Sequence, residues 1–292
     1  MHADPGPESP RPLDADALRR ELVERPGAPY TSLEVLEEVG STNAEAMRRA
    51  GLGAADRGVL LAEYQASGRG RLGRTWTAPP RTQVVVSVLL RPGSVSPTLF
   101  GWLPLVTGLA IRDGLVAAGG VDATLKWPND VLVDGGKIAG ILSEMTTVPA
   151  EGDFELRLPA LVVGVGINVT LTREQLPVPH ATSLALSGGT TDRDVVARAV
   201  LEALAHRHEQ WRRCERGSGS TISDELMAEY SAACSTVGAE VRVELPGDVV
   251  RTGRAARVDR EGRLVVVTPD GELSVAAGDV THVRPAAGRW GG

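Results

Sequence analysis

Gly68–Trp76 reads G-R-G-R-L-G-R-T-W and follows Gly58–Gln65, whose opening apolar run (G-V-L-L-A-E-Y-Q) predicts a buried strand. Three glycines allow backbone conformations with positive φ and a close approach of the main chain to a ligand. The same segment carries three guanidinium groups, those of Arg69, Arg71 and Arg74. Backbone N–H groups and arginine side chains together bind phosphate or carboxylate oxygens. The segment therefore predicts an anion-binding loop, with a solvated basic loop as the alternative.

The glycine spacing also matches G-x-G-x-x-G, the dinucleotide-binding fingerprint. That fingerprint requires a helix at the third glycine and an acidic residue about 20 positions later. Here Gly73 is followed by R-T-W-T-A-P-P, and the two prolines are incompatible with an ordinary helix. Residues 84–92, where the acidic residue would fall, contain neither Asp nor Glu. The pattern is therefore a poor match to a Rossmann fold.

Composition limits the classes of function. A chain of 292 residues has room for one large and one small domain, and a formal net charge of −6 is unusual for a general nucleic-acid-binding protein. Cys214 and Cys234 lack metal-ligand spacing, so we expect unpaired thiols in a reducing compartment. There is no N-terminal apolar h-region and no run of 18 apolar residues. We therefore expect a soluble cytoplasmic protein that binds neither DNA nor a membrane.

Lysine is almost absent from the chain. Of 31 basic residues only Lys126 and Lys137 are lysines, and both lie in 125–140, L-K-W-P-N-D-V-L-V-D-G-G-K-I-A-G. Because arginine serves as the ordinary cation here, these lysines indicate sites that require a compact ammonium. Lys137 opens an apolar strand after a D-G-G turn, where desolvating a lone ammonium is costly unless an anion pairs with it. The alternative is a lysine at the end of a hairpin that points into solvent.

Periodicity and capping signals predict the order of the elements. Helical periodicity predicts helices over 14–25, 42–51, 99–118, 192–216 and 222–233. Apolar runs predict strands over 33–39, 58–65, 83–91, 123–127, 131–133, 137–145 and 161–169. Thr42 and Glu45 have the spacing of a capping box at the start of the second helix. Residues 146–157 are acidic and are predicted to form a loop.

After the last predicted helix, the sequence pattern changes from helical periodicity to short apolar segments separated by turns. Five short apolar segments, several of them separated by P-G-D, R-E-G and P-D-G turns, predict strands over 240–245, 249–258, 263–268, 272–275 and 280–283. Five strands in about fifty residues suggest a small closed barrel of SH3-like size. We therefore divide the chain into a disordered tail (1–12), a main domain (13–235), a small β domain (236–285) and a second tail (286–292).

Four motifs, in this order, resemble the biotin–protein ligases: G-R-G-R-L-G-R-T-W, K-W-P-N-D-V, G-K-I-A-G-I-L and G-V-G-I-N-V. The S-T-N of 41–43 lies upstream, and the resemblance extends over residues 33–285. It implies an α/β (α+β) fold, with a mixed β-sheet catalytic domain of the biotin/lipoate ligase type and an SH3-like C-terminal barrel. It also implies an enzyme that forms biotinyl-5′-AMP from biotin and MgATP. Biotin would then pass to a lysine on the biotin carboxyl carrier domain of a carboxylase such as acetyl-CoA carboxylase.

The resemblance implies site residues position by position. Those matching the biotin-binding set are Ser41, Thr42, Asn43, Gln65, Arg69, Gly70, Arg71 and Lys137. Those matching the ATP or adenylate set are Arg69, Arg71, Arg74, Trp76, Lys126, Asn129, Asp130, Asn168 and Arg284. Lys137, Arg71 and Asp130 would be the catalytic residues, and Asp130 would also be the Mg²⁺ ligand.

The chemistry of adenylation suits these residue types. A carboxylate must attack the α-phosphorus of a polyanion, and fixed cations reduce that repulsion and stabilise the transition state. The alternatives are a lipoate–protein ligase with the same adenylate chemistry and a non-catalytic biotin-binding module; the ordered motifs and the predicted barrel favour the biotin ligase. Some family members carry an N-terminal winged helix-turn-helix and also act as repressors. Only 40 residues precede Ser41, so we expect the form without a DNA-binding domain.

Overall fold

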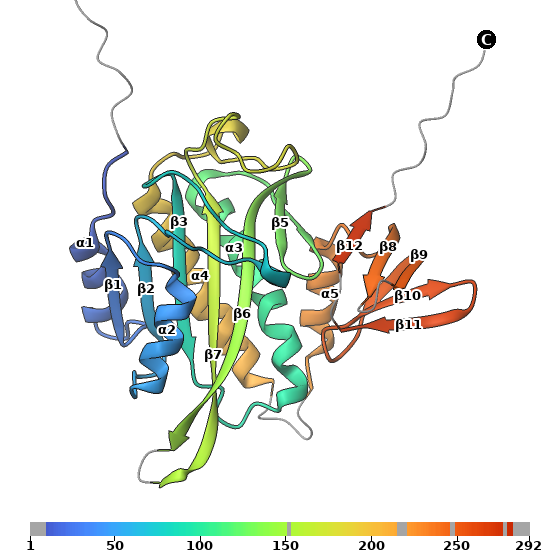
Figure 1. Ribbon diagram of the computed structural model, residues 1–292, viewed down its shortest axis with the longest axis horizontal. Helices are drawn as coiled ribbons and strands as arrows, with labels where there is room; N and C mark the ends of the chain where they lie inside the picture. The colour runs from blue at the N-terminus through green and yellow to red at the C-terminus, as the bar shows by residue number, and fades with distance from the viewer. Residues whose placement is uncertain (1–9, 151–152, 215–220, 246–248, 277–278, 283–292) are drawn as a thin grey trace, which may run out of the picture.

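The computed structural model describes residues 10–150, 153–214, 221–245, 249–276 and 279–282. Its main domain is built on a seven-stranded sheet of order β1-β2-β3-β7-β6-β5-β4 (Figure 1). The strands are β1 (Ser32–Leu36), β2 (Gly58–Ala62), β3 (Gln83–Leu90), β4 (Thr124–Lys126), β5 (Asp130–Val133), β6 (Gly136–Ala150) and β7 (Asp153–Asn168). β1 and β2 pair in parallel, and the remaining neighbours pair antiparallel. The predicted mixed sheet is therefore confirmed.

The inner strand β3 is buried on both faces, which explains why its sequence is apolar except for Gln83 and Ser87. Val84, Val86 and Val88 join the large core beneath α3 (Leu103–Gly119) and α4 (Arg193–Arg213). On the other face, Leu89 packs with Ala46 of α2 (Thr42–Gly51) (Figure 1). The sheet therefore has helices on both faces. The other helical segments are α1 (Ala15–Arg19), η1 (Arg20–Glu24), η2 (Arg71–Gly73), η3 (Pro97–Trp102), η4 (Ala185–Ser187) and α5 (Asp224–Ala233).

The segment Pro97–Gly119 is long and apolar enough to cross a membrane by length and composition alone. Its most apolar window is 67% buried inside the protein, where α3 packs against both α4 and the sheet. Its ends follow the predicted signals, since Ser96 Oγ accepts a hydrogen bond from Thr98 N and Gly120 stops the helix at φ 69°. The apolar character is that of a core helix.

The small C-terminal domain is a five-stranded antiparallel sheet of order β11-β10-β9-β8-β12. Its strands are β8 (Glu240–Leu245), β9 (Val249–Val258), β10 (Leu264–Thr268), β11 (Gly271–Val275) and β12 (Asp279–His282), close to the predicted bounds. It packs against the main domain through two tryptophans. Trp102 Nε1 donates to the Asp259 carbonyl at 3.1 Å, and Trp127 Nε1 donates to the Gly262 carbonyl at 3.0 Å. One continuous apolar core therefore runs through both domains.

The prediction of a loop over 146–157 is wrong. Strands β6 and β7 continue past the rest of the sheet as a long hairpin, in which Val148 pairs with Leu158 and Pro149 with Arg157 (Figure 1). Residues 153–158 read D-F-E-L-R-L, an alternation of polar and apolar residues that is typical of a strand. The loop was predicted from the acidic residues of this stretch, although they occupy the polar positions of a period-two strand pattern.

The predicted capping box is also wrong, by one residue. The N-cap of α2 is Ser41, whose Oγ accepts from Ala44 N at 3.4 Å. The Glu45 carboxylate binds Arg48 and Arg49 at 2.7 Å rather than reaching back to the helix start. Ser41 therefore performs the capping, and the Thr42 side chain is available for another contact.

Candidate active site

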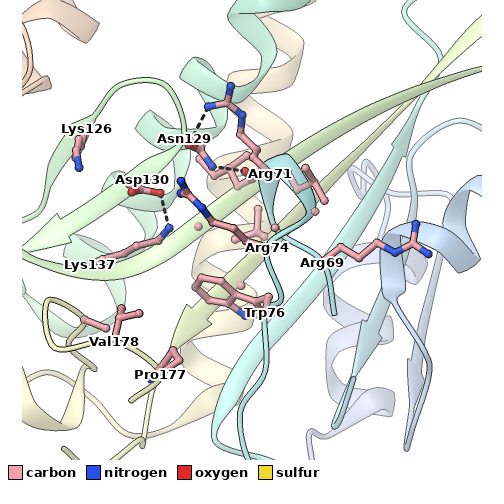
Figure 2. Close-up of a pocket in the computed structure, with 18 of the residues that line it drawn as sticks. Arg69, Arg71, Arg74, Trp76, Lys126, Asn129, Asp130, Lys137, Pro177 and Val178 are labelled. Atoms are coloured by element: carbon pink, nitrogen blue, oxygen red, sulfur yellow. Dashed lines mark hydrogen bonds and ion pairs between the residues drawn. The ribbon is translucent and has the colours of Figure 1, made fainter. Parts of the chain in front are cut away.

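A cavity of about 810 Å³ lies where β6, β7, the start of α2 and the segment before β5 meet (Figure 2). Every predicted site residue that the structure describes lines it: Ser41, Thr42, Asn43, Gln65, Arg69, Gly70, Arg71, Arg74, Trp76, Lys126, Asn129, Asp130, Lys137 and Asn168. Arg284, the remaining predicted residue, lies outside the described residues. Segments far apart in the chain therefore converge on one site.

A hydrogen-bonded polar cluster lies at one end of the cavity: Thr42, Asn43 and Gln65 line the cavity, and Ser87 and Glu144 support them from behind. Gln65 Oε1 accepts from Thr42 N at 2.8 Å and from Thr42 Oγ1 at 3.0 Å. Ser87 Oγ lies 2.8 Å from Thr42 Oγ1 and 2.6 Å from Asn43 Oδ1. Gln65 Nε2 makes no hydrogen bond within the described part of the chain, so its N–H groups are available to a ligand.

Asn43 is fully engaged by the protein itself. Its Nδ2 donates to the Leu142 carbonyl at 3.0 Å and to Glu144 Oε2 at 2.8 Å, while its Oδ1 faces Ser87. A Cβ added at Gly164 would overlap Asn43 Oδ1, so the glycine is what lets this amide lie on β7. Asn43 therefore shapes the cavity, and Ser87 and Glu144, which were not predicted, hold it in place. Ser87 had one signal: it is the lone hydroxyl in V-V-V-S-V-L-L.

The arginine loop, residues 68–76, forms the opposite wall. It contains only the single turn η2, with Leu72 at φ 55° and Gly73 at φ 73°, which fits the exclusion of a Rossmann helix. Arg71 NH1 donates to Asn129 Oδ1 at 3.3 Å, and burial lowers the pKa of this guanidinium. Figure 2 shows Arg74 directed toward Asp130, whereas Arg69 extends away from the cavity centre and is exposed. Two of the three predicted guanidinium groups therefore face the site.

Lys137 lies between the arginine loop and β5. Its Nζ is 2.6 Å from Asp130 Oδ1 and 5.5 Å from the centre of the Trp76 ring (Figure 2). Both charged side chains are 21% exposed, so this pair is neither free in solvent nor fully desolvated. The alternative of a hairpin-end lysine that points into solvent is therefore wrong.

Trp76 is tied to the sheet by a chain of amides. Trp76 Nε1 donates to Gln83 Oε1 at 3.1 Å, and Gln83 Nε2 donates to Asn168 Oδ1 at 2.7 Å. Asn168 Nδ2 donates in turn to the Thr182 carbonyl at 2.9 Å. A Cβ at Gly166 would overlap the indole, so G-V-G-I-N provides the space for both Asn43 and Trp76. Asn168 therefore lines the cavity and also anchors the loop.

Asp130 provides a test of the predicted Mg²⁺ site. Its Oδ1 is buried and has the Lys137 ion pair but no hydrogen bond to any other residue that the structure describes. Among the described residues there is no group of three or more His, Cys, Asp or Glu placed to hold a metal. Mg²⁺ commonly uses one or two protein carboxylates together with substrate phosphates and water. A single carboxylate in a cation-rich cavity therefore fits an ion that is bound jointly with a nucleotide, and does not fit a permanent protein-only metal site.

Comparisons with known proteins agree with this geometry. Residues 41–168 match the biotin/lipoate A/B protein ligase family, and residues 236–283 match the biotin protein ligase C terminal domain. The chain is 41% identical to the biotin–acetyl-CoA-carboxylase ligase of Mycobacterium tuberculosis, over 94% of this chain and 97% of that protein. It is 30% identical to the bifunctional ligase/repressor BirA of Bacillus spizizenii, over 83% of this chain and 71% of that protein. The solved structure of the Aquifex aeolicus biotin protein ligase with biotin and ATP has a TM-score of 0.68 and 27% identity, and it covers 88% of this chain and 100% of that one.

Proposed function

The chain belongs to the biotin protein ligase family and is a ligase, and we propose that its cavity forms biotinyl-5′-AMP from biotin and MgATP. The biotinyl group then passes to a lysine on the biotin carboxyl carrier domain of acetyl-CoA carboxylase, the partner that the name of the Mycobacterium tuberculosis relative implies. The observation that carries this proposal is the arrangement of one cavity, with neutral polar groups at one end and Arg71, Arg74 and Lys137 facing the other.

The polar cluster suits the bicyclic urea of biotin. A urea carbonyl needs hydrogen-bond donors, and Gln65 Nε2 is free to donate. Ser41 Oγ is used as an acceptor at the helix cap, so its own proton is also free. Asn43 was predicted to contact the ureido ring, but its side-chain amide is already hydrogen-bonded to Leu142, Glu144 and Ser87. We propose Ser41, Thr42 and Gln65 as ureido contacts and Asn43 as the residue that positions them.

The cationic end suits the transfer chemistry. An oxygen of the biotin carboxylate attacks the α-phosphorus, and the bond from that phosphorus to the bridging oxygen breaks, so that pyrophosphate leaves. Lys137, Arg71 and Arg74 stabilise the charge that spreads over these oxygens. In the second step the acceptor lysine amine attacks the acyl carbon and AMP leaves. No side-chain nucleophile is needed in either step.

In this proposal Mg²⁺ would bind beside Asp130, together with the ATP phosphates. When bound, Mg²⁺ would supply charge neutralisation on the ATP phosphates, and Asp130 would be its protein ligand. The ion pair with Lys137 at 2.6 Å orients the Asp130 carboxylate toward the same region. We propose that the biotin carboxylate shares Lys137 from the opposite side.

The test is ATP–pyrophosphate exchange by the purified chain with biotin, lipoate or no acid added. We expect exchange that depends on biotin and is lost when Mg²⁺ is chelated. Transfer is then checked with a purified carrier domain, using a carrier whose acceptor lysine is replaced by arginine as the matched control. Exchange with lipoate in place of biotin would support the lipoate–protein ligase, and biotin binding without exchange would support a non-catalytic module.

A further inference from the structure

The small C-terminal domain contributes to the cavity through three side chains, Glu244, Val280 and His282. They come from paired strands, because β12 lies antiparallel to β8 with Val280 opposite Val243 and His282 opposite Val241. Glu244 is ion-paired with Arg242 at 3.3 Å, which offsets its negative charge. His282 is thus the polar group of this domain whose contribution to the cavity remains unassigned.

A short chain of hydrogen bonds fixes the imidazole of His282. Trp127 N donates to Thr236 Oγ1 at 3.1 Å, and the same Oγ1 lies 3.0 Å from His282 Nε2. Because the hydroxyl oxygen accepts from the backbone N–H, its own proton is free to donate to Nε2. When the hydroxyl donates to Nε2, the neutral ring carries its own proton on Nδ1. Thr236 is fully buried, so no solvent competes for this bond.

The protonation state at neutral pH follows from the surroundings. Burial and the nearby Lys126 ammonium lower the pKa of His282 below its ordinary value, which favours the neutral ring. With Nε2 held by Thr236, Nδ1–H is the polar group that the ring can offer to a ligand, and it has no hydrogen-bond acceptor among the described residues. Lys126, the neighbouring cation, lines the same cavity.

We propose that His282 binds the nucleotide by donating a hydrogen bond from Nδ1 to a phosphate oxygen of ATP, and that Thr236 positions the ring by fixing its tautomer. The inference rests on the proposed function, since it requires ATP in this cavity. A neutral N–H donor beside Lys126 adds affinity for a phosphate oxygen without a second positive charge. The Thr236 link also connects this donor to Trp127, in the segment that carries Lys126, Asn129 and Asp130.

The test measures the KM values for ATP and biotin in biotin-dependent ATP–pyrophosphate exchange. His282→Ala is expected to raise the KM for ATP by about tenfold and to leave the KM for biotin unchanged. His282→Asn, which keeps a donor near the Nδ1 position, should restore the KM for ATP to within about threefold of wild type. His282→Gln moves the donor toward the Nε2 position and should behave like alanine.

Thr236 is tested by a matched pair of variants. Thr236→Val should raise the KM for ATP several-fold, whereas Thr236→Ser, which keeps the hydroxyl, should stay near wild type; thermal unfolding of each variant shows whether the fold is retained. An unchanged KM for ATP in His282→Ala, or equal rescue by Gln and Asn, overturns the inference while wild-type exchange still supports the proposed function. A wild-type chain without biotin-dependent exchange overturns both.

Discussion

The two walls of the cavity are built in opposite ways. In the polar cluster Thr42, Asn43 and Ser87 are at most 4% exposed, and each is hydrogen-bonded to another residue of the cluster. In the arginine loop Leu72 is 68% exposed and Arg74 is also exposed. The first wall is fixed by the sheet before any substrate arrives, whereas the second has little apolar burial to hold it. From this difference we infer that the cluster recognises the ligand and that the loop closes over it.

The physical reason lies in the residue types. Three glycines in nine residues carry a high conformational entropy, and ordering them requires a compensating interaction. Like-charged arginines repel one another until an anion lies between them. The cluster has no such cost, because its groups satisfy each other inside strands and at a helix start. We therefore expect ligand to organise the loop and to leave the cluster unchanged.

The largest effect is expected at Lys137, where the two walls meet. Lys137→Ala should lower biotin-dependent pyrophosphate exchange by about 10²–10³-fold, since a preorganised charge beside the reacting carboxylate is lost. Lys137→Arg should also be impaired, because a planar guanidinium cannot occupy the space between Asp130 and Trp76. Arg213→Ala, on the exposed side of α4, is the control and should keep wild-type activity. Near-normal exchange in both Lys137 variants would contradict this assignment.

The second-largest effect is expected at Gly164, which contacts the polar cluster, and it is compared with the effect at Gly166, which contacts the arginine loop. Gly164→Ala places a methyl group on Asn43 Oδ1, which accepts from Ser87, while Asn43 Nδ2 is held by Glu144. The variant should weaken biotin binding by about 10²-fold and lower stability by about 1–3 kcal/mol. Gly166→Ala instead meets the Trp76 indole, which is hydrogen-bonded to Gln83 but belongs to an exposed loop, so the stability of this variant should stay closer to wild type. Calorimetric titration with biotin and thermal unfolding measure both quantities. Equal destabilisation by the two variants would mean that the polar cluster and the arginine loop are equally rigid.

Ser87→Ala should produce an intermediate effect. Loss of the hydroxyl leaves Asn43 Oδ1 without its donor, which should cost about 1 kcal/mol of stability and raise the KM for biotin by roughly tenfold. Ser143→Ala is the matched control in the same sheet, because Ser143 Oγ is buried without a hydrogen-bond partner among the described residues. It should be neutral or slightly stabilising. Identical biotin KM values for the two variants would show that Ser87 does not organise the cluster.

The smallest effect on the KM for ATP is expected at Arg69, which extends away from the cavity centre. Arg69→Ala should change the KM for ATP by no more than about threefold, whereas Arg71→Ala should raise it by more than tenfold, since Arg71 is half-buried against Asn129. Steady-state exchange at saturating biotin gives both values. A larger increase in the KM for ATP in Arg69→Ala than in Arg71→Ala would mean that Arg69, and not Arg71, faces the nucleotide when the loop closes.

Much of this molecule could be predicted from the sequence, because the decisive signals are local. The D-G-G turn, the mostly apolar run of β3 and the C-terminal turn residues are local signals of this kind, and β8 and β9 were predicted with their observed bounds. The family resemblance implied 14 cavity residues that the structure describes. Local signals failed where polar residues interrupt a strand, as in the β6–β7 hairpin.

The supporting contacts could not be predicted, because they join residues distant in the chain. Glu144 reaches Asn43 across 101 positions and Thr236 reaches His282 across 46. Nothing in the local pattern around either residue distinguishes such a contact from an ordinary strand or loop position. The sequence therefore predicts which residues form the cavity, while the tertiary structure decides which of them are already engaged by protein.

The central claim is that the cluster is preformed and that ligand organises the arginine loop. Hydrogen–deuterium exchange of the peptides covering 83–90 and 68–76 tests it directly, with no addition, with biotin, and with biotin plus ATP. We predict that the β3 amides are strongly protected under all three conditions, and that the loop amides exchange fast alone and become at least tenfold slower with both substrates. Loop amides that are as protected as β3 without substrate, or that are unchanged by biotin plus ATP, would contradict the account.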